Sequence, residues 1–172
     1  INHVEGGEEA VIRACLDKVA AFTGHRPRGW LSPGLRETVD TADILKRCGI
    51  DYVCDWVVDD RPSWMRTTAG PMIAMPYNLE INDSIIYAIE RHATGEMAKR
   101  VEFTLRRFER ECRDSAIVFA IGLHPHLISV PHRIHELERM LDLLTDSKDV
   151  GFFTGRDLAD WYMAAAPAPA KV

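Results

Sequence analysis

The sequence predicts an α/β fold in which parallel strands alternate with helices. In residues 7–22 and 83–113, apolar residues recur at the three- and four-residue spacing of an amphipathic helix. Residues 50–54, 72–75 and 116–123 are short apolar runs of strand length, and the last is unbroken, as in a strand buried on both faces. Strands and helices that alternate along a chain in this way favour a parallel sheet covered by helices.

Composition restricts the function classes. The chain has 172 residues, 47% of them hydrophobic and 27% charged, which is typical of a globular domain. A net charge of -5 argues against nucleic acid or anionic membrane as a partner. The four cysteines form no Cys-x-x-Cys pair, which favours reduced thiols. Because there is also no membrane-length apolar run and no signal sequence, we expect a cytoplasmic location.

The first half of the chain supplies three predicted strands. A helix over residues 7–22 precedes them, and its predicted buried stripe is Val11, Cys15, Val19 and Phe22. A strand at 30–31 leads into a predicted helix over 35–47, and the next strand covers 50–54. Residues 55–70 contain paired aspartates and prolines and are predicted to be irregular, ahead of the strand at 72–75.

The second half is predicted to be mainly helical. The block 83–113 breaks at Thr94-Gly95, and the strand at 116–123 follows it. A helix over 131–145, with Pro131 at its first position, and a strand at 150–153 come next. Thr154 then caps a helix that reaches residue 165. We expect one domain over residues 1–165 and a frayed Ala/Pro tail at 166–172.

Active sites of parallel α/β proteins gather at the carboxyl ends of strands. His124 directly follows the strand at 116–123, where it suits a proton donor or metal ligand near neutral pH. The alternative is a core histidine bonded to a backbone carbonyl. His126 points to the same face if the extended backbone continues past Pro125.

Asp55 follows the strand at 50–54, where it can orient a histidine or act as acid or base; alternatively it caps a turn. Trp56 can wall a pocket or pack in the core. Asn82 and Asp83 precede the helical block, and their alternative role is to cap that helix.

Five segments, in order, resemble the polysaccharide deacetylase superfamily. They are residues 29–34 (GWLSPG), 51–56 (DYVCDW), 59–64 (DDRPSW), 75–83 (MPYNLEIND) and 122–126 (GLHPH). The third and fourth segments are typical of the branch that contains the bacterial allantoinases of this fold.

This resemblance implies an incomplete, distorted (β/α) barrel that hydrolyses an amide or related carbon-nitrogen bond. In the family, a metal-bound water attacks the carbonyl, an aspartate acts as base, and a histidine protonates the departing nitrogen. The histidine's role maps onto His124, and Asp55 is the second predicted catalytic residue. The predicted substrate-binding residues are Trp30, Ser32, Pro33, Trp56, Asn82, Asp83 and His126.

The sequence also departs from the family. The family's metal and base aspartates and its His-x-x-x-His pair lie in the first barrel strands, most of which this sequence lacks. Only His3 stands near the position of one of these ligands, so we expect it to bind a divalent metal, zinc, together with residues upstream of Ile1. The family arginine beside the Pro-containing loop has no counterpart, and Leu31 stands near its position.

We therefore predict an amide hydrolase that acts on a small amide, ureide or cyclic imide and forms a homo-oligomer. If the sequence is truncated, we expect this chain alone to be inactive. The alternatives are an N-acetyl-sugar deacetylase that acts on polysaccharide or peptidoglycan, and a non-catalytic binding module of the same fold.

Overall fold

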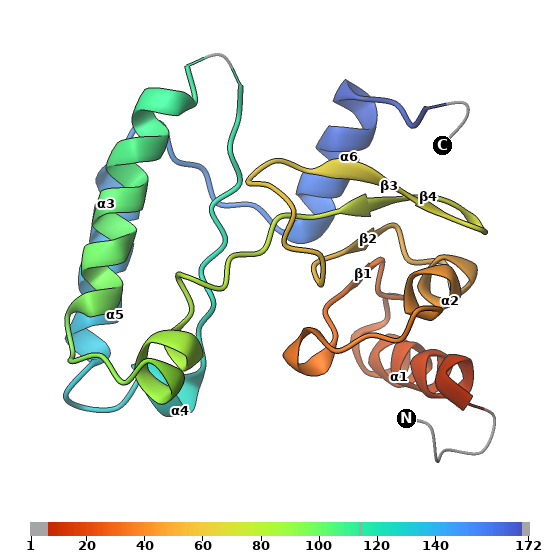
Figure 1. Cartoon of the computed structure of the whole chain (residues 1–172), viewed down its shortest axis with the longest axis horizontal. Coiled ribbons are helices and arrows are strands. Elements are labelled where there is room, and N and C mark those ends of the chain that lie inside the picture. Colours follow the sequence, from red (N-terminus) through yellow and green to blue (C-terminus); the bar gives the residue numbers. More distant parts are fainter. Residues whose placement is uncertain (1–6, 114, 170–172) are drawn as a thin grey trace. The chain divides into compact units, whose positions relative to one another are not determined.

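A computed structural model describes residues 7–113 and 115–169. They form two compact units, and each is described by itself. Unit 1 comprises the chain up to Pro76 together with the segment from Phe153, and unit 2 is Tyr77–Phe152. Figure 1 shows the elements in sequence colours. The prediction of one domain over residues 1–165 stays a prediction.

Unit 1 contains a four-stranded sheet with the strand order β1-β2-β4-β3. β1, β2 and β4 run parallel, as the sequence predicts, whereas β3 pairs antiparallel with β4 as a hairpin (Figure 1). The strands are β1 (Gly29–Trp30), β2 (Tyr52–Val53), β3 (Ser63–Thr67) and β4 (Gly70–Ala74).

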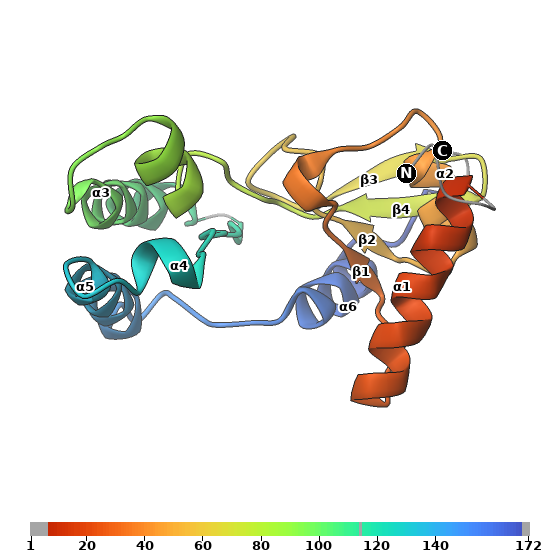
Figure 2. The same cartoon turned by 90° about the horizontal axis from the view of Figure 1, so that it is seen from below.

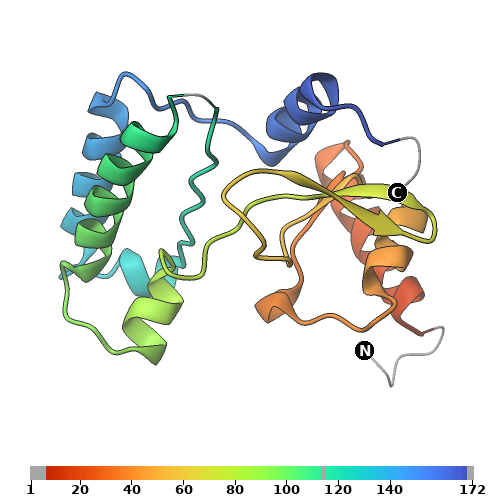
Figure 3. The same cartoon turned by 45° about the horizontal axis from the view of Figure 1, so that its top comes forward.

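Helices cover both faces of this sheet, because successive strand residues point to opposite sides. Val53 and Met72 pack with α1 (Gly7–Thr23) and α2 (Thr41–Arg47). Tyr52 and Ile73, their neighbours in the strands, pack instead with Ala159 of α6 (Gly155–Ala165). Figure 3 shows α6, in blue, on the opposite side of the sheet from the red and orange helices.

Unit 2 is built on two helices, α3 (Glu96–Glu111) and α5 (Ile134–Asp146), which lie side by side (Figure 2). A π-helix, Ser84–Ile89, precedes α3, and the short helix α4 (Pro125–Ile128) precedes α5. The buried apolar residues of α3 and α5 are Met97, Ala98, Val101, Leu105, Met140 and Leu144. Met97, Val101 and Leu105, which stand at helical spacing in the predicted block 83–113, therefore belong to this core.

A buried carboxylate joins the helices of unit 2. Glu136, on α5, accepts the backbone N–H of Ala98 at 2.9 Å and the hydroxyl of Tyr87. It thus satisfies a donor at the amino end of α3 that has no partner within the helix. Burial, followed by the bond to Glu136, raises the pKa of Tyr87 above its ordinary value. The guanidinium of Arg133 lies 4.3 Å above the Tyr87 ring.

Local signals predict several boundaries correctly. α1 and α6 occupy the predicted ranges, and Thr154 forms a capping box with Asp157. The predicted break before α3 is confirmed, because Gly95 has a φ of 105°. The buried face of α1 differs from the prediction: Ile12 and Leu16 are buried, whereas Cys15, Val19 and Phe22 are exposed. Both sets of residues have helical spacing, so spacing alone does not show which set is buried.

Two predictions in residues 35–70 are wrong. The predicted helix over 35–47 begins only at Thr41, because Leu35 has a φ of 54° and the Thr38 N–H donates to Thr41 Oγ1 at 2.8 Å. A 3-10 turn, Pro33–Leu35, precedes this break. The segment 55–70, predicted to be irregular, contains β3, which β4 pairs in register.

The predicted strands at 116–123 and 150–153 are not formed. A strand needs a hydrogen-bonded neighbour, and within the described residues the first of these segments finds one only where Gly122 forms a single bridge with Asn82. α5 begins at Ile134 rather than at Pro131. In the predicted tail, the carbonyl of Ala166 accepts the Trp64 indole N–H at 2.8 Å, and residues 170–172 lie outside the described residues.

Replacement of Gly29 by alanine tests the register of the sheet. A Cβ at Gly29 would lie 2.0 Å from the Tyr52 ring, so Gly29→Ala is expected to destabilise the protein by about 1–3 kcal/mol. Urea unfolding followed by circular dichroism measures this loss. In a Tyr52→Leu background the same change is expected to cost less, because the opposing ring is absent. An equal cost in both backgrounds would contradict the assigned contact.

Candidate functional site

The predicted site residues fall into two groups. Unit 1 holds Trp30, Ser32, Pro33, Asp55 and Trp56, and unit 2 holds Asn82, Asp83, His124 and His126. His3 lies outside the described residues.

In unit 2, both carboxylate oxygens of Asp83 bind His124. Oδ1 lies 2.6 Å from the ring Nδ1, and Oδ2 accepts the His124 backbone N–H at 2.7 Å. Asp83 is fully buried, whereas the His124 side chain is 42% exposed. The carboxylate therefore fixes the orientation of the ring, selects Nδ1 as the protonated nitrogen and leaves the Nε2 edge for another molecule.

A short parallel bridge brings these two residues together. The Asp83 N–H donates to the Gly122 carbonyl at 3.1 Å, and the Gly122 N–H donates to the Ile81 carbonyl at 2.9 Å. Glycine is required at position 122, because a Cβ there would lie 2.4 Å from Asn82 Nδ2. His124 follows two residues later, at the amino end of α4.

Asn82 and His126 differ in how they relate to this pair. Asn82 is buried; its amide donates to the Tyr77 hydroxyl at 3.1 Å and its Oδ1 accepts the Ser84 N–H at 2.9 Å. Its side chain, rather than that of Asp83, therefore caps the start of the π-helix. His126 is exposed on α4, where the helical backbone replaces the extended one assumed in the prediction. Its ring lies edge-to-face with that of His124, 5.8 Å between centroids.

In unit 1, three predicted residues form one hydrogen-bonded group beyond the carboxyl ends of β1 and β2. Asp55 Oδ1 accepts the Ser32 N–H at 2.7 Å, and the Trp30 indole N–H donates to Ser32 Oγ at 2.9 Å. Asp55 thus holds the loop that follows β1, and Pro33 begins the 3-10 turn in that loop.

Sequence reasoning missed Glu37, which belongs to the same group. The Trp56 indole N–H donates to Glu37 Oε2 at 2.9 Å, and the Glu37 carboxyl group lies next to that of Asp55. Burial, followed by the bond to Asp55, raises the pKa of Glu37 to about 7. The sequence predicts a helix over 35–47, and on that helix Glu37 would be an ordinary charged residue of the solvent-exposed face. For this reason it was not recognised as a site residue.

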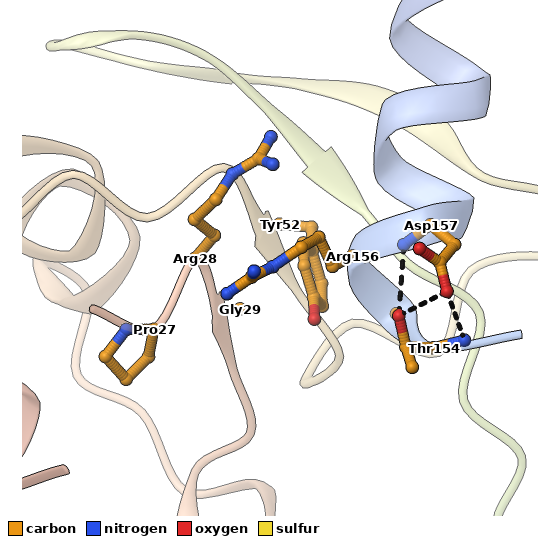
Figure 4. A pocket seen from close by; sticks show the side chains of 8 residues that line it. Pro27, Arg28, Gly29, Tyr52, Thr154, Arg156 and Asp157 are labelled. Atoms are coloured by element: carbon orange, nitrogen blue, oxygen red, sulfur yellow. Dashed lines mark hydrogen bonds between the residues drawn. The ribbon is translucent and has the colours of Figure 1, made fainter. Parts of the chain in front are cut away.

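A pocket of about 480 Å³ lies at the other ends of these strands, between the start of β1, Tyr52 and the first turn of α6 (Figure 4). Three of its polar side chains have partners within the protein. Thr154 and Asp157 form the capping box drawn as dashed lines, and Arg28 pairs with Asp51 at 2.6 Å and Asp160 at 2.8 Å. Because catalytic groups of parallel α/β proteins gather at carboxyl ends, this pocket is not the candidate site.

The described residues do not fit a metal centre by themselves. Within residues 7–113 and 115–169, no three His, Cys, Asp or Glu side chains are grouped as a metal ion requires. The prediction that His3 binds zinc therefore stays a prediction.

Two solved structures share the fold of this chain. The Puue allantoinase matches it with a TM-score of 0.87 and 24% identity, over 96% of this chain and 56% of that chain. A probable polysaccharide deacetylase from Pseudomonas aeruginosa PAO1 matches with a TM-score of 0.83 and 26% identity, over 95% of this chain and 56% of that chain. The chain has the polysaccharide deacetylase-type fold. The α/β class and the resemblance predicted from the sequence are thereby confirmed.

The deacetylase-type chain spans about 56% of the length of both matched structures. No family model matches the sequence, and no curated protein does. None of the helices in the described part of the chain has the length and apolar character needed to cross a membrane. The cytoplasmic location stays a prediction.

Replacement of Asp83 by asparagine tests the support of His124. An asparagine keeps one acceptor oxygen but turns an NH2 group toward the second His124 donor, so one buried hydrogen bond is lost. Asp83→Asn is expected to destabilise the protein by about 1–3 kcal/mol in urea unfolding. The control is Asp142→Asn, on an exposed residue of α5, which is expected to change stability by less than about 0.5 kcal/mol. Equal stabilities of the two variants would argue against the pair.

Proposed function

We propose that the protein hydrolyses a carbon-nitrogen bond of the amide class, with His124 as the general acid. The observation that carries this proposal is the half-exposed imidazole whose Nδ1 and backbone N–H are both held by the fully buried Asp83. A histidine held in this way can present a proton at Nε2, which a histidine packed inside a core cannot. The fold supports the proposal, because one matched structure is an allantoinase and the other a probable polysaccharide deacetylase.

In the proposed reaction, water adds to the carbonyl carbon and gives up one proton to the solvent, and the carbon-nitrogen bond then breaks to leave a carboxylic acid. The protonated His124 gives its Nε2 proton to the departing nitrogen, which leaves as the neutral amine or amide. Asp83 stabilises the imidazolium before this transfer and keeps the ring in place after it. A positioned general acid of this kind contributes a factor of about 10²–10⁴ to the rate.

We propose a small amide, ureide or cyclic imide as the substrate class. The support is the Asp-Asp-x-Pro-x-Trp segment at 59–64 and the Pro-Tyr-x-Leu-Glu-x-Asn-Asp segment at 76–83, together with the allantoinase among the matched structures. The second candidate is deacetylation of an N-acetyl sugar, which the other matched structure favours.

A substrate panel separates these candidates. The full-length protein is assayed with allantoin, with succinimide-type rings and with N-acetylglucosamine oligomers. We expect turnover of a small ureide or imide and none of the oligomers. Turnover of the oligomers alone would contradict the small-substrate proposal.

The proposed role of His124 is tested by its replacement. His124→Gln is expected to lower kcat at least about a hundredfold without unfolding the protein, because glutamine cannot supply a titrating proton. His135→Gln, on an exposed residue of α5, is the matched control and is expected to leave kcat unchanged. Circular dichroism verifies the fold of both variants. Unchanged kinetics in His124→Gln would overturn the assignment.

A further inference from the structure

Two carboxyl groups, those of Glu37 and Asp55, lie next to each other beyond the end of β2. Glu37 Oε2 accepts the Trp56 indole N–H, and Asp55 Oδ1 accepts the Ser32 backbone N–H. The other two oxygens, Glu37 Oε1 and Asp55 Oδ2, are buried and receive no donor. Among the described residues, neither carboxyl group forms an ion pair with lysine or arginine.

Ionised carboxylates are acceptors only, so two of them cannot hydrogen-bond to each other. Two neighbouring carboxylates also repel each other, so one carboxyl group of the pair keeps its proton to a higher pH. A single proton on either group converts it into a donor and satisfies both buried oxygens at once. We propose that Glu37 and Asp55 share one proton, and that Glu37 is thereby the positioning residue that holds Asp55 at the carboxyl end of β2.

The surrounding groups favour retention of this proton. The negative charge of Glu8, on α1, also raises the pKa of Glu37; Thr38, next to Glu37, donates its hydroxyl to Glu8 at 2.6 Å. The indole N–H of Trp56 opposes this effect, because it stabilises the ionised form of Glu37. Burial has the largest influence, and the pKa of Glu37 rises to about 7.

The shared proton makes the stability of the loop at residues 31–38 depend on pH. The folded pKa of Glu37 lies above its ordinary value of 4.5, so the folded protein binds more protons than the unfolded chain between these pH values. The stability due to the pair is therefore complete below about pH 4.5 and is lost as the pH rises through about 7. Above that pH, the two ionised carboxylates repel and release Asp55 from Glu37. The shared proton does not depend on the proposed function. Only an effect of this proton on turnover would rest on that function.

The test is a pH titration of the intact chain by nuclear magnetic resonance. The side-chain carboxyl carbons of Glu37 and Asp55 and the indole N–H of Trp56 are followed between pH 3 and 9. We expect the Glu37 carbon to report a step with a midpoint near pH 7, and the signals of the neighbouring Asp55 carbon and Trp56 N–H to shift at the same pH. Glu37→Gln is expected to remove this step from the signals of Asp55 and Trp56. Asp40→Asn, on an exposed residue that follows this loop, is expected to keep the step.

The wild-type titration is decisive even if Glu37→Gln fails to fold. Titration of Glu37 at its ordinary value of 4.5, with no step near pH 7 in the signals of Asp55 and Trp56, would overturn the shared proton. Because this measurement uses no substrate, a failure of the proposed hydrolysis leaves its result unaffected, and the converse also holds.

Discussion

The bond between a fully buried carboxylate and a half-exposed imidazole is the interaction on which the candidate site of unit 2 depends. A buried carboxylate without partners is strongly destabilising, and Asp83 avoids this because both of its oxygens accept hydrogen bonds from His124. One of these bonds holds the His124 backbone and the other holds the His124 ring. The Asp83 carboxylate therefore cannot turn without losing both bonds. The imidazole is thus oriented before any substrate arrives, which is the condition for efficient proton transfer.

The rest of unit 2 explains why this bond forms. Gly122 permits the close approach of Asn82, and the resulting bridge sets Asp83 opposite the segment that carries His124. Asn82 is itself fixed by Tyr77 and Ser84. The core of α3 and α5, with Glu136 bound to the amino end of α3, gives these segments a rigid support. Unit 1 holds an aspartate at the end of a strand in a different way, because Asp55 meets another acid rather than a histidine.

The sequence predicts the parts of this structure that depend on neighbours close along the chain. Helical spacing locates α1 and α3, the Thr154 cap locates α6, and the Gly95 break is another local signal. His124 was a candidate because of its place after an apolar run, yet that run forms no strand among the described residues, since pairing depends on segments far away in the sequence. Glu37 was not predicted for the same reason. Its partners Asp55 and Trp56 come close to it only when β1 and β2 lie side by side.

The tautomer of His124 tests the central claim most directly. Long-range proton-nitrogen correlation spectra, recorded at a pH where the ring is neutral, identify which nitrogen carries the hydrogen. If Asp83 holds the ring as described, the spectra will show hydrogen on Nδ1 and an unprotonated Nε2, and Asp83→Asn will weaken this preference. Hydrogen on Nε2 in the wild-type protein would show that Asp83 does not accept from the ring, and the proposed support for the general acid would be lost.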